Sequence, residues 1–231
     1  MIETMMARPL VVLLHLCDSL FPIGGFGYSD GLEAATAAGL VKTPAELQAW
    51  LEVCLDEVVG RMDGPAALRA WCAFDRQEWE ALCELDEELT AMRPCSATRR
   101  SSRAMGLRLV TTWATLYPDQ RLDQLLDLAR GQSLGPALPI AFGCACASAG
   151  VGMRDTGAAF AYTRLAASTS AALRLMRIGQ TDAHAQLATA LGRVPMVVEA
   201  MTTRARPESF TPAMDVSAMT QPYLHSRLFR S

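Results

Sequence analysis

The chain has 231 residues, of which 51% are hydrophobic and 19% are charged, and its formal net charge is −3 at pH 7. This apolar balance predicts either a large core or a surface that partners partly cover. No interior stretch has the Pro-, Ser- and charge-rich composition of a linker, which predicts one domain over residues 1–231. The charge pattern contains no basic stripe typical of nucleic-acid binding, so we expect no nucleic-acid partner.

Apolar residues recur with a helical period along most of the chain. The pattern predicts an all-α fold, a single-domain compact bundle of about ten helices. The clearest start signal is Thr43-Pro44 with Glu46, a capping box with proline in the first turn, and the apolar stripe behind it reaches Val58. The other helices are expected, in chain order, at residues 10–18, 29–38, 64–75, 76–92, 94–117, 121–130, 136–150, 155–178, 180–191 and 195–205.

Two clusters of charge fall on these predicted helices. The carboxylates at residues 86–88 are expected on a solvated helix face. For Arg99, Arg100 and Arg103 two interpretations stay open, a solvated face with local ion pairs or a contact with a partner.

The predicted helix at 155–178 is dense in alanine and serine. Small side chains allow neighbouring backbones to approach closely, so we expect a central helix packed on several sides. Arg174 near its end suits the negative end of the helix dipole, and Gly179 is expected to be its C′ stop.

The seven cysteines are an odd number and lie mostly in apolar helical patterns, which predicts a reduced, cytoplasmic setting with buried thiols. Cys144 and Cys146 are the one close pair, but on a helix their side chains point about 200° apart, which disfavours a metal site. The only lysine, Lys42, lies outside any Gly-rich loop, which excludes a P-loop nucleotidase. We expect no metal, no cofactor and no catalytic residue, and a small thiol-dependent helical enzyme stays as the less favoured alternative.

Two runs imitate export or membrane signals. Residues 10–17 are apolar but are followed by no small-residue cleavage site. Residues 131–153 carry no charge, yet they are rich in Gly, Ala, Ser and Cys and contain Pro136 and Pro139. An interior helix explains the second run better than a membrane span, so we expect a soluble protein with no membrane partner.

The Gly-dense stretch at 21–33 is the most informative part of the N-terminal half. Its glycines allow a sharp turn that presents Phe26 and Tyr28. Ser29 is placed to cap the following helix, with Glu33 on the first turn. A docking loop and a purely internal helix-to-helix turn are both compatible with this pattern.

The C-terminal residues are the second informative stretch. The prolines between Arg206 and Pro212, and again at Gln221-Pro222, break helical structure and predict a tail over 206–231. Leu228 and Phe229 are apolar anchors that offset the entropy of ordering such a tail on a partner.

These motifs together resemble the family of urease accessory protein F (UreF), from about residue 10 to the C-terminus. Residues 21–33 look like its "P-x-G-x-F-x-Y-S-x-G-L-E" signature, Ser102-x-x-Met105-Gly106 like its mid-chain element, Arg174 with Gly179-Gln180 like its "R-L-x-x-x-G-Q" element, and residues 226–231 like its terminal signature.

The resemblance implies a dimer-forming, non-enzymatic chaperone. It would bridge the accessory protein D (or H) and the nickel-carrying GTPase G, so that nickel reaches apo-urease, with a tail that is flexible alone and ordered against the D/H partner. The residues expected to bind partners are Phe26, Tyr28, Ser29, Glu33, Arg174, Gln180, Arg227, Leu228 and Phe229. Arg174 and Gln180 are equally compatible with holding the C-terminal half of the fold or a dimer contact. A helical adaptor for another metalloenzyme is the alternative function.

The chain departs from the family pattern at one place. Family members often carry a His-Glu pair shortly before the terminal signature, where this chain has Gln221-Pro222. Any metal or proton role of that pair is therefore not expected here, and the proline is expected to affect how the tail docks.

Overall fold

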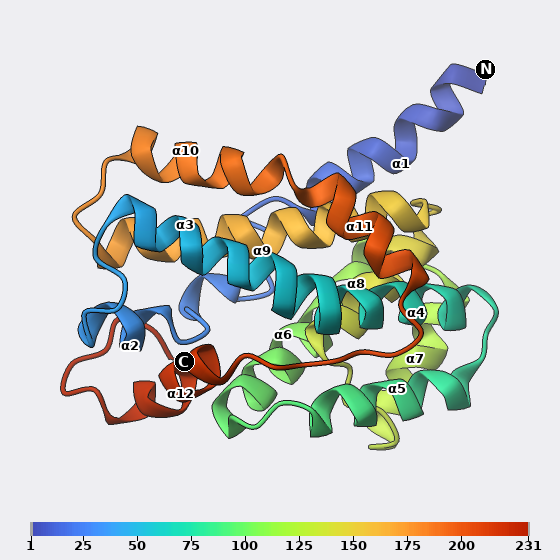
Figure 1. The fold of residues 1–231 in the computed structure, drawn as a ribbon. Helices are drawn as coiled ribbons and strands as arrows, with labels where there is room; N and C mark the ends of the chain where they lie inside the picture. Colours follow the sequence, from blue (N-terminus) through green and yellow to red (C-terminus); the bar gives the residue numbers. More distant parts are fainter. Residues whose placement is uncertain (1, 231) are drawn as a thin grey trace.

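The computed structural model describes residues 2–230, with side chains from Pro9 onward, and all regular structure in this range is helical (Figure 1). The α-helices are α1 (Ile2–Leu16), α2 (Leu32–Ala37), α3 (Pro44–Val53), α4 (Gly64–Asp75), α5 (Trp79–Ala91), α6 (Ser96–Leu116), α7 (Gln120–Arg130), α8 (Leu138–Ser148), α9 (Met153–Leu175), α10 (Gln180–Leu191), α11 (Val194–Thr203) and α12 (Pro212–Thr220). A π-helix spans Cys54–Asp63, and short 3-10 turns lie at Gly25–Gly27 and Gln221–Tyr223. The predicted all-α bundle is confirmed.

Helix α8 forms the centre of the core. All of its residues from Leu138 to Ala147 are buried, and α4 crosses it so closely that a Cβ at Gly143 would lie 2.1 Å from the carbonyl oxygen of Ala67. The uncharged run is therefore an interior helix, as predicted. Within residues 2–230, none of the helices combines the length and the apolar character that a membrane crossing requires.

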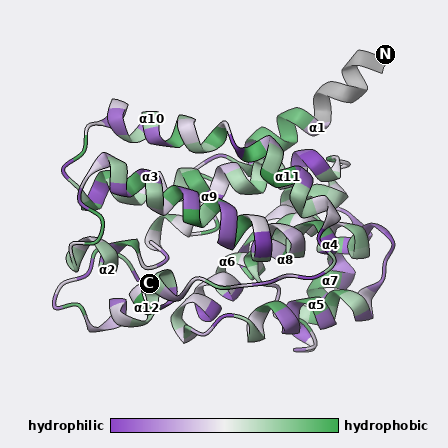
Figure 2. Cartoon of the chain, in the orientation of Figure 1, coloured by the Kyte–Doolittle hydropathy of each residue, from purple (hydrophilic) through white to green (hydrophobic). Residues whose placement is uncertain are grey.

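Helix α9 is the central helix that its small side chains predict. It packs against α2, α4, α8, α10 and α11, and Figure 1 shows α3 and α10 alongside it. Most of the surrounding helices carry both hydrophilic and hydrophobic residues, as amphipathic helices do (Figure 2). The predicted stop at Gly179 is wrong, because α9 ends at Leu175, where Met176 turns to extended backbone; Gly179 has φ −69° and precedes α10 as its N-cap.

The helix behind Thr43 begins with the predicted capping box, in which Glu46 accepts from the Thr43 N–H at 2.9 Å. It does not end near residue 58. The backbone stays helical from α3 through the π-helix into α4. The widened π turns lie under the C-terminal segment, where the N–H of Glu208 donates to the carbonyl of Arg61 at 2.8 Å.

The carboxylate of Asp86 is buried, so the predicted solvated face is wrong for this residue. It accepts hydrogen bonds from the N–H groups of Gly135 (3.1 Å) and Ala137 (2.8 Å), which precede α8 and have no helical acceptor of their own. Burial raises the pKa of Asp86, and these two hydrogen bonds oppose the shift. Asp86 thereby holds the entry of the core helix.

The C-terminal segment differs from the expected flexible tail. It contains α12, which begins with Pro212 in its first turn, the position where proline suits a helix. From there to Arg230 the chain lies against α2, α6 and the part of the Gly-dense stretch that precedes α2, residues 21–31, which we call the Gly-rich loop. Phe229 is buried. Figure 1 shows the C-terminus beside α12 and close to α2. The structure gives the tail a docked position; Ser231 lies outside the described residues.

Candidate functional site: the tail-docking cluster

The carboxylate of Glu33 is the centre of the contact between loop and tail. Its oxygens accept from the N–H groups of Leu228 (2.5 Å) and Phe229 (3.1 Å), and Glu33 is buried. It lies on the first turn of α2, as predicted. Hydrogen bonds to an ionised acceptor are among the stronger ones in proteins, so Glu33 fixes the end of the tail.

Gln221 completes this polar centre. Its amide nitrogen donates to Glu33 at 3.2 Å, and its amide oxygen accepts from the hydroxyl of Ser29 at 3.0 Å. Gln221 is fully buried. No sequence signal points to this role except the departure at Gln221-Pro222, because the partners are nearly two hundred positions away along the chain.

The role predicted for Ser29 changes accordingly. Helix α2 begins at Leu32 with Gly31 as its N-cap, so Ser29 is not the capping residue. Its hydroxyl accepts from the N–H of Glu33 at a long 3.4 Å and donates to Gln221. Ser29 thus orients the glutamine that holds Glu33.

An arginine between two aromatic rings closes the cluster on its apolar side. The guanidinium carbon of Arg174 lies 3.9 Å from the ring centroid of Phe26 and 3.9 Å from that of Phe229. The same guanidinium donates to the carbonyl of Phe26 at 2.7 Å. Cation–π contacts of this kind are worth about 0.5–2 kcal/mol each, so Arg174 joins the loop, α9 and the tail.

Two backbone features let the loop and the tail approach each other. The N–H of Arg230 donates to the carbonyl of Gly27 at 2.8 Å. Gly31 has φ +89°, and a Cβ there would lie 2.8 Å from the backbone nitrogen of Ala218 in α12. Only glycine fits this position, because the conformation is left-handed and backbone occupies the space that a side chain would need.

The other predicted residues lie outside these contacts. Gln180 is exposed at the start of α10, and Arg227 is exposed on the tail. Tyr28 belongs to the loop itself, but it is half-buried and packs against the core. Of the predicted set, the structure therefore brings together Phe26, Ser29, Glu33, Arg174, Leu228 and Phe229.

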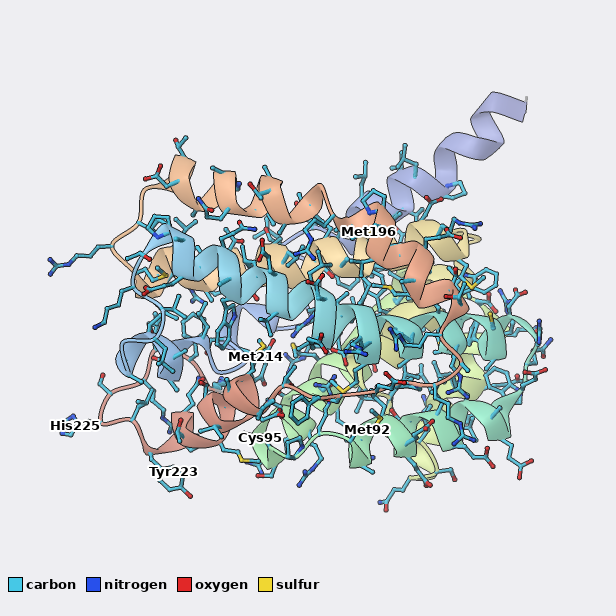
Figure 3. All side chains as sticks on the ribbon, in the orientation of Figure 1. Met92, Cys95, Met196, Met214, Tyr223 and His225 are labelled. Atoms are coloured by element: carbon cyan, nitrogen blue, oxygen red, sulfur yellow. The ribbon has the colours of Figure 1, made fainter. Side chains whose placement is uncertain are left out.

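Apolar side chains surround the cluster on the outside. Phe26 is 65% exposed and Leu228 58% exposed, although each neighbours a buried contact. Tyr223 is 87% exposed, and Figure 3 shows it projecting away from the body, as His225 does further along the tail. Phe210, Val216 and Met219 are also exposed on this segment. We call Phe26, Tyr223 and Leu228 the apolar rim.

A groove of about 950 Å³ lies next to the cluster. The end of α1, the Gly-rich loop and one side of α9 form its walls, with Met105 and Phe142 among the lining residues. Arg164 on α9 pairs with Asp30 of the loop at this groove. The lining is mainly apolar and suits another polypeptide or an apolar ligand better than an ion.

The thiols do not form a reactive site. Cys144 and Cys146 are fully buried, and burial raises the pKa of both well above the ordinary thiol value. Burial likewise raises the pKa of Cys17 to about 11. Among the described residues, no three His, Cys, Asp or Glu side chains gather in a way that would hold a metal ion. The thiol-dependent enzyme is disfavoured by these positions.

Comparison with known proteins agrees with the motif arrangement. The UreF family model matches residues 41–191. The urease accessory protein UreF of Methylibium petroleiphilum is 32% identical over 97% of this chain and 95% of that protein. The proteins of the same name from Azoarcus sp. and Teredinibacter turnerae are 30% and 29% identical, over 96% and 98% of the chain. With a family match over more than half of its length and relatives that align along nearly all of it, this chain belongs to the UreF family of urease accessory proteins.

Proposed function

We propose that this chain is the scaffold that joins the accessory D/H protein and the nickel-carrying GTPase G during urease maturation in the cytoplasm. As a member of the UreF family it is an accessory protein of that maturation and not an enzyme. In this proposal the metal travels with the GTPase, and the helical body orients the partners relative to apo-urease. The alternative of a helical adaptor for a different metalloenzyme is disfavoured, because the relatives that align over nearly the whole chain are named urease accessory proteins.

The observation that carries the proposal is the apolar rim around the docked tail. Glu33, Arg174 and Phe229 hold the tail in one position, yet Leu228 next to them remains 58% exposed. Exposed apolar side chains on a fixed backbone are preorganised for a protein contact, because little conformational entropy is lost when they become buried.

A docked tail also refines the expectation that the D/H partner orders it. In the proposal the partner covers the outer side of the tail and stabilises a position that the chain already adopts. The conformation in which the partner orders the tail is then the same as the conformation in which the tail docks on the body.

The test separates the two faces of the tail. Leu228→Ser removes an exposed side chain and leaves the Glu33 hydrogen bonds intact, so we expect an unchanged thermal midpoint and at least tenfold weaker binding of purified D/H protein. Phe229→Ser should lower both the affinity for D/H protein and the protection of the tail amides from hydrogen exchange. Arg206→Ser, an exposed change outside the rim, is the matched control. Unchanged affinity of Leu228→Ser for both D/H and G would refute a partner role of the rim.

The proposed homodimer has a candidate surface at the groove. Tyr162 on α9 is 42% exposed there, with Ala166 and Ala167 on the following turn, and small side chains favour close helix packing. Leu10, Val11 and Leu14 on α1 are more exposed than Tyr162, which leaves this helix apolar on its outer side. Ala167→Arg should convert a dimer to a monomer in sedimentation experiments. A dimer that persists in this variant would exclude the α9 surface.

A further inference from the structure

Helix α6 carries charge of one sign only. Its charged residues are Arg99, Arg100, Arg103 and Arg108, while the whole chain has a net charge of −3. Two of them lie near the N-terminus of the helix, where the dipole disfavours positive charge. Local helix stability therefore does not explain this arrangement, and each arginine needs its own explanation.

Contacts within the chain explain two of the four. Arg99 donates to the carbonyl of Pro94 at 3.0 Å and to that of Arg93 at 2.5 Å, which fixes the turn before α6. Arg103 lies 4.0 Å from the buried carboxylate of Asp86 and offsets its charge.

The other two arginines lack such roles. Arg108 makes one long hydrogen bond, 3.3 Å, to the carbonyl of Ile23 in the Gly-rich loop. Arg100 has no polar contact with any side chain or backbone group in the part of the chain that the structure describes, and it is exposed. Neither guanidinium has a carboxylate partner among those residues, so both keep their charge available at the surface.

The two guanidinium groups without a carboxylate partner lie on one side of α6. Positions 100 and 108 are eight residues apart, which is about 12 Å along a helix and about 80° around its axis, so with Ala104 they follow one i, i+4, i+8 ridge. Ala104 lies between them, and Leu107 borders this ridge beside Arg108; both are exposed, Leu107 by 45%. This face adjoins the loop at Gly24, where a Cβ would lie 2.4 Å from the Arg108 guanidinium, and so it continues toward Phe26 of the apolar rim.

We propose that this face of α6 binds an acidic protein surface, with two carboxylates about 12 Å apart on the partner and an apolar side chain between them. The inference rests on the scaffold function and names the charge of the surface that the scaffold recognises. Two forks next to an exposed leucine suit a protein, because interface cores are apolar and arginine is enriched in them. The negative net charge of the chain disfavours a nucleic-acid backbone, which would need many more cations.

The test compares charge reversal with charge retention. Purified D/H protein and purified GTPase G, with GTP and magnesium, are titrated against wild type, Arg100→Glu, Arg100→Glu/Arg108→Glu and Arg100→Lys/Arg108→Lys. Arg154→Glu is the control, because Arg154 is also exposed but already pairs with Glu199. Circular dichroism checks folding, and Arg100→Glu should have an unchanged or higher thermal midpoint, since it removes a positive charge from the helix start.

For one of the two partners we expect about tenfold weaker binding with Arg100→Glu and about a hundredfold with the double reversal. Recovery to within threefold is expected for the lysine pair, with no change for Arg154→Glu. Binding of that partner by wild type should weaken with added salt more steeply than binding by the double reversal.

Three other outcomes overturn the inference in distinguishable ways. If wild type binds a partner and the double reversal binds both partners as tightly, the acidic contact is absent and the scaffold function stands. If wild type binds neither partner, the scaffold function falls and this inference falls with it. Tighter binding of a 30-base-pair DNA duplex than of either protein, lost in the double reversal, would replace the protein partner by nucleic acid.

Discussion

The substitution Glu33→Gln tests how the tail is held. It keeps the size of the side chain but removes the charge and one acceptor oxygen, so the N–H groups of Leu228 and Phe229 no longer share a carboxylate. A hydrogen bond to a charged group contributes about 1.5–3 kcal/mol, and a buried donor left without an acceptor costs about 1–3 kcal/mol. A loss of about 2 kcal/mol in docking free energy is therefore expected, which is about 30-fold in the docking equilibrium.

Native-state hydrogen exchange measures this equilibrium directly. In Glu33→Gln, we expect protection of the Phe229 and Arg230 amides to fall by about 10–100-fold, while amides of α8 keep theirs, because detachment of the tail is a local opening. Glu208→Gln is the control, since Glu208 is more than half exposed and its ion pairs with Arg61 and Arg204 contribute little. Equal protection of the tail in wild type and Glu33→Gln would refute the view that this carboxylate fixes it.

The remaining predictions concern the rest of the fold. Gly31→Ala should lower the thermal midpoint by about 4–8 °C, because Gly31 has a left-handed conformation and an added Cβ would also clash with the backbone of α12. Gly150 has φ +70° but open space around it, so Gly150→Ala should lower the thermal midpoint by about half as much. Equal shifts in the two variants would contradict the clash. The raised pKa of Asp86 means that its contribution to stability is fully present below the unfolded pKa near 3.8 and is lost as pH rises through the folded pKa. Wild type should thus lose stability relative to Asp86→Asn over that window in denaturant titrations, and a constant difference would argue against a shifted carboxyl. Under native conditions a maleimide should modify the half-buried Cys72 well before Cys144, and the reverse order would show that the core thiol is accessible.

Local signals in the sequence were sufficient for most of the helices. The capping box at Thr43 and the small residues of α9 determine their elements through contacts within a few positions, and both predictions are confirmed. Proline was harder to interpret. Pro212 is compatible both with the end of a preceding helix and with the start of a following one, so the sequence alone predicts an irregular tail where the structure has α12.

The polar contacts were less predictable than the helices, because they depend on distant partners. Asp86 looks like part of a solvated run, and only the N–H groups before α8 make its burial favourable. Gln221 carries no local pattern at all, yet it joins Ser29 to Glu33. The motif residues of the loop and the tail were recognisable, whereas the distinction between residues that hold the tail and residues that face outward required the structure.

That distinction determines how tail docking and partner binding are coupled. If a partner contacts Leu228 only when the tail is docked, its apparent dissociation constant is the intrinsic value divided by the docked fraction. A tail that is docked about 99% of the time in wild type is still docked about three quarters of the time after a 30-fold loss, so Glu33→Gln should weaken partner binding by less than about 1.5-fold. Leu228→Ser removes the contact itself and should weaken binding more, with no change in tail protection. Binding losses of equal size in the two variants, alongside full protection in both, would mean that Glu33 contacts the partner directly and that docking and recognition are not separate steps.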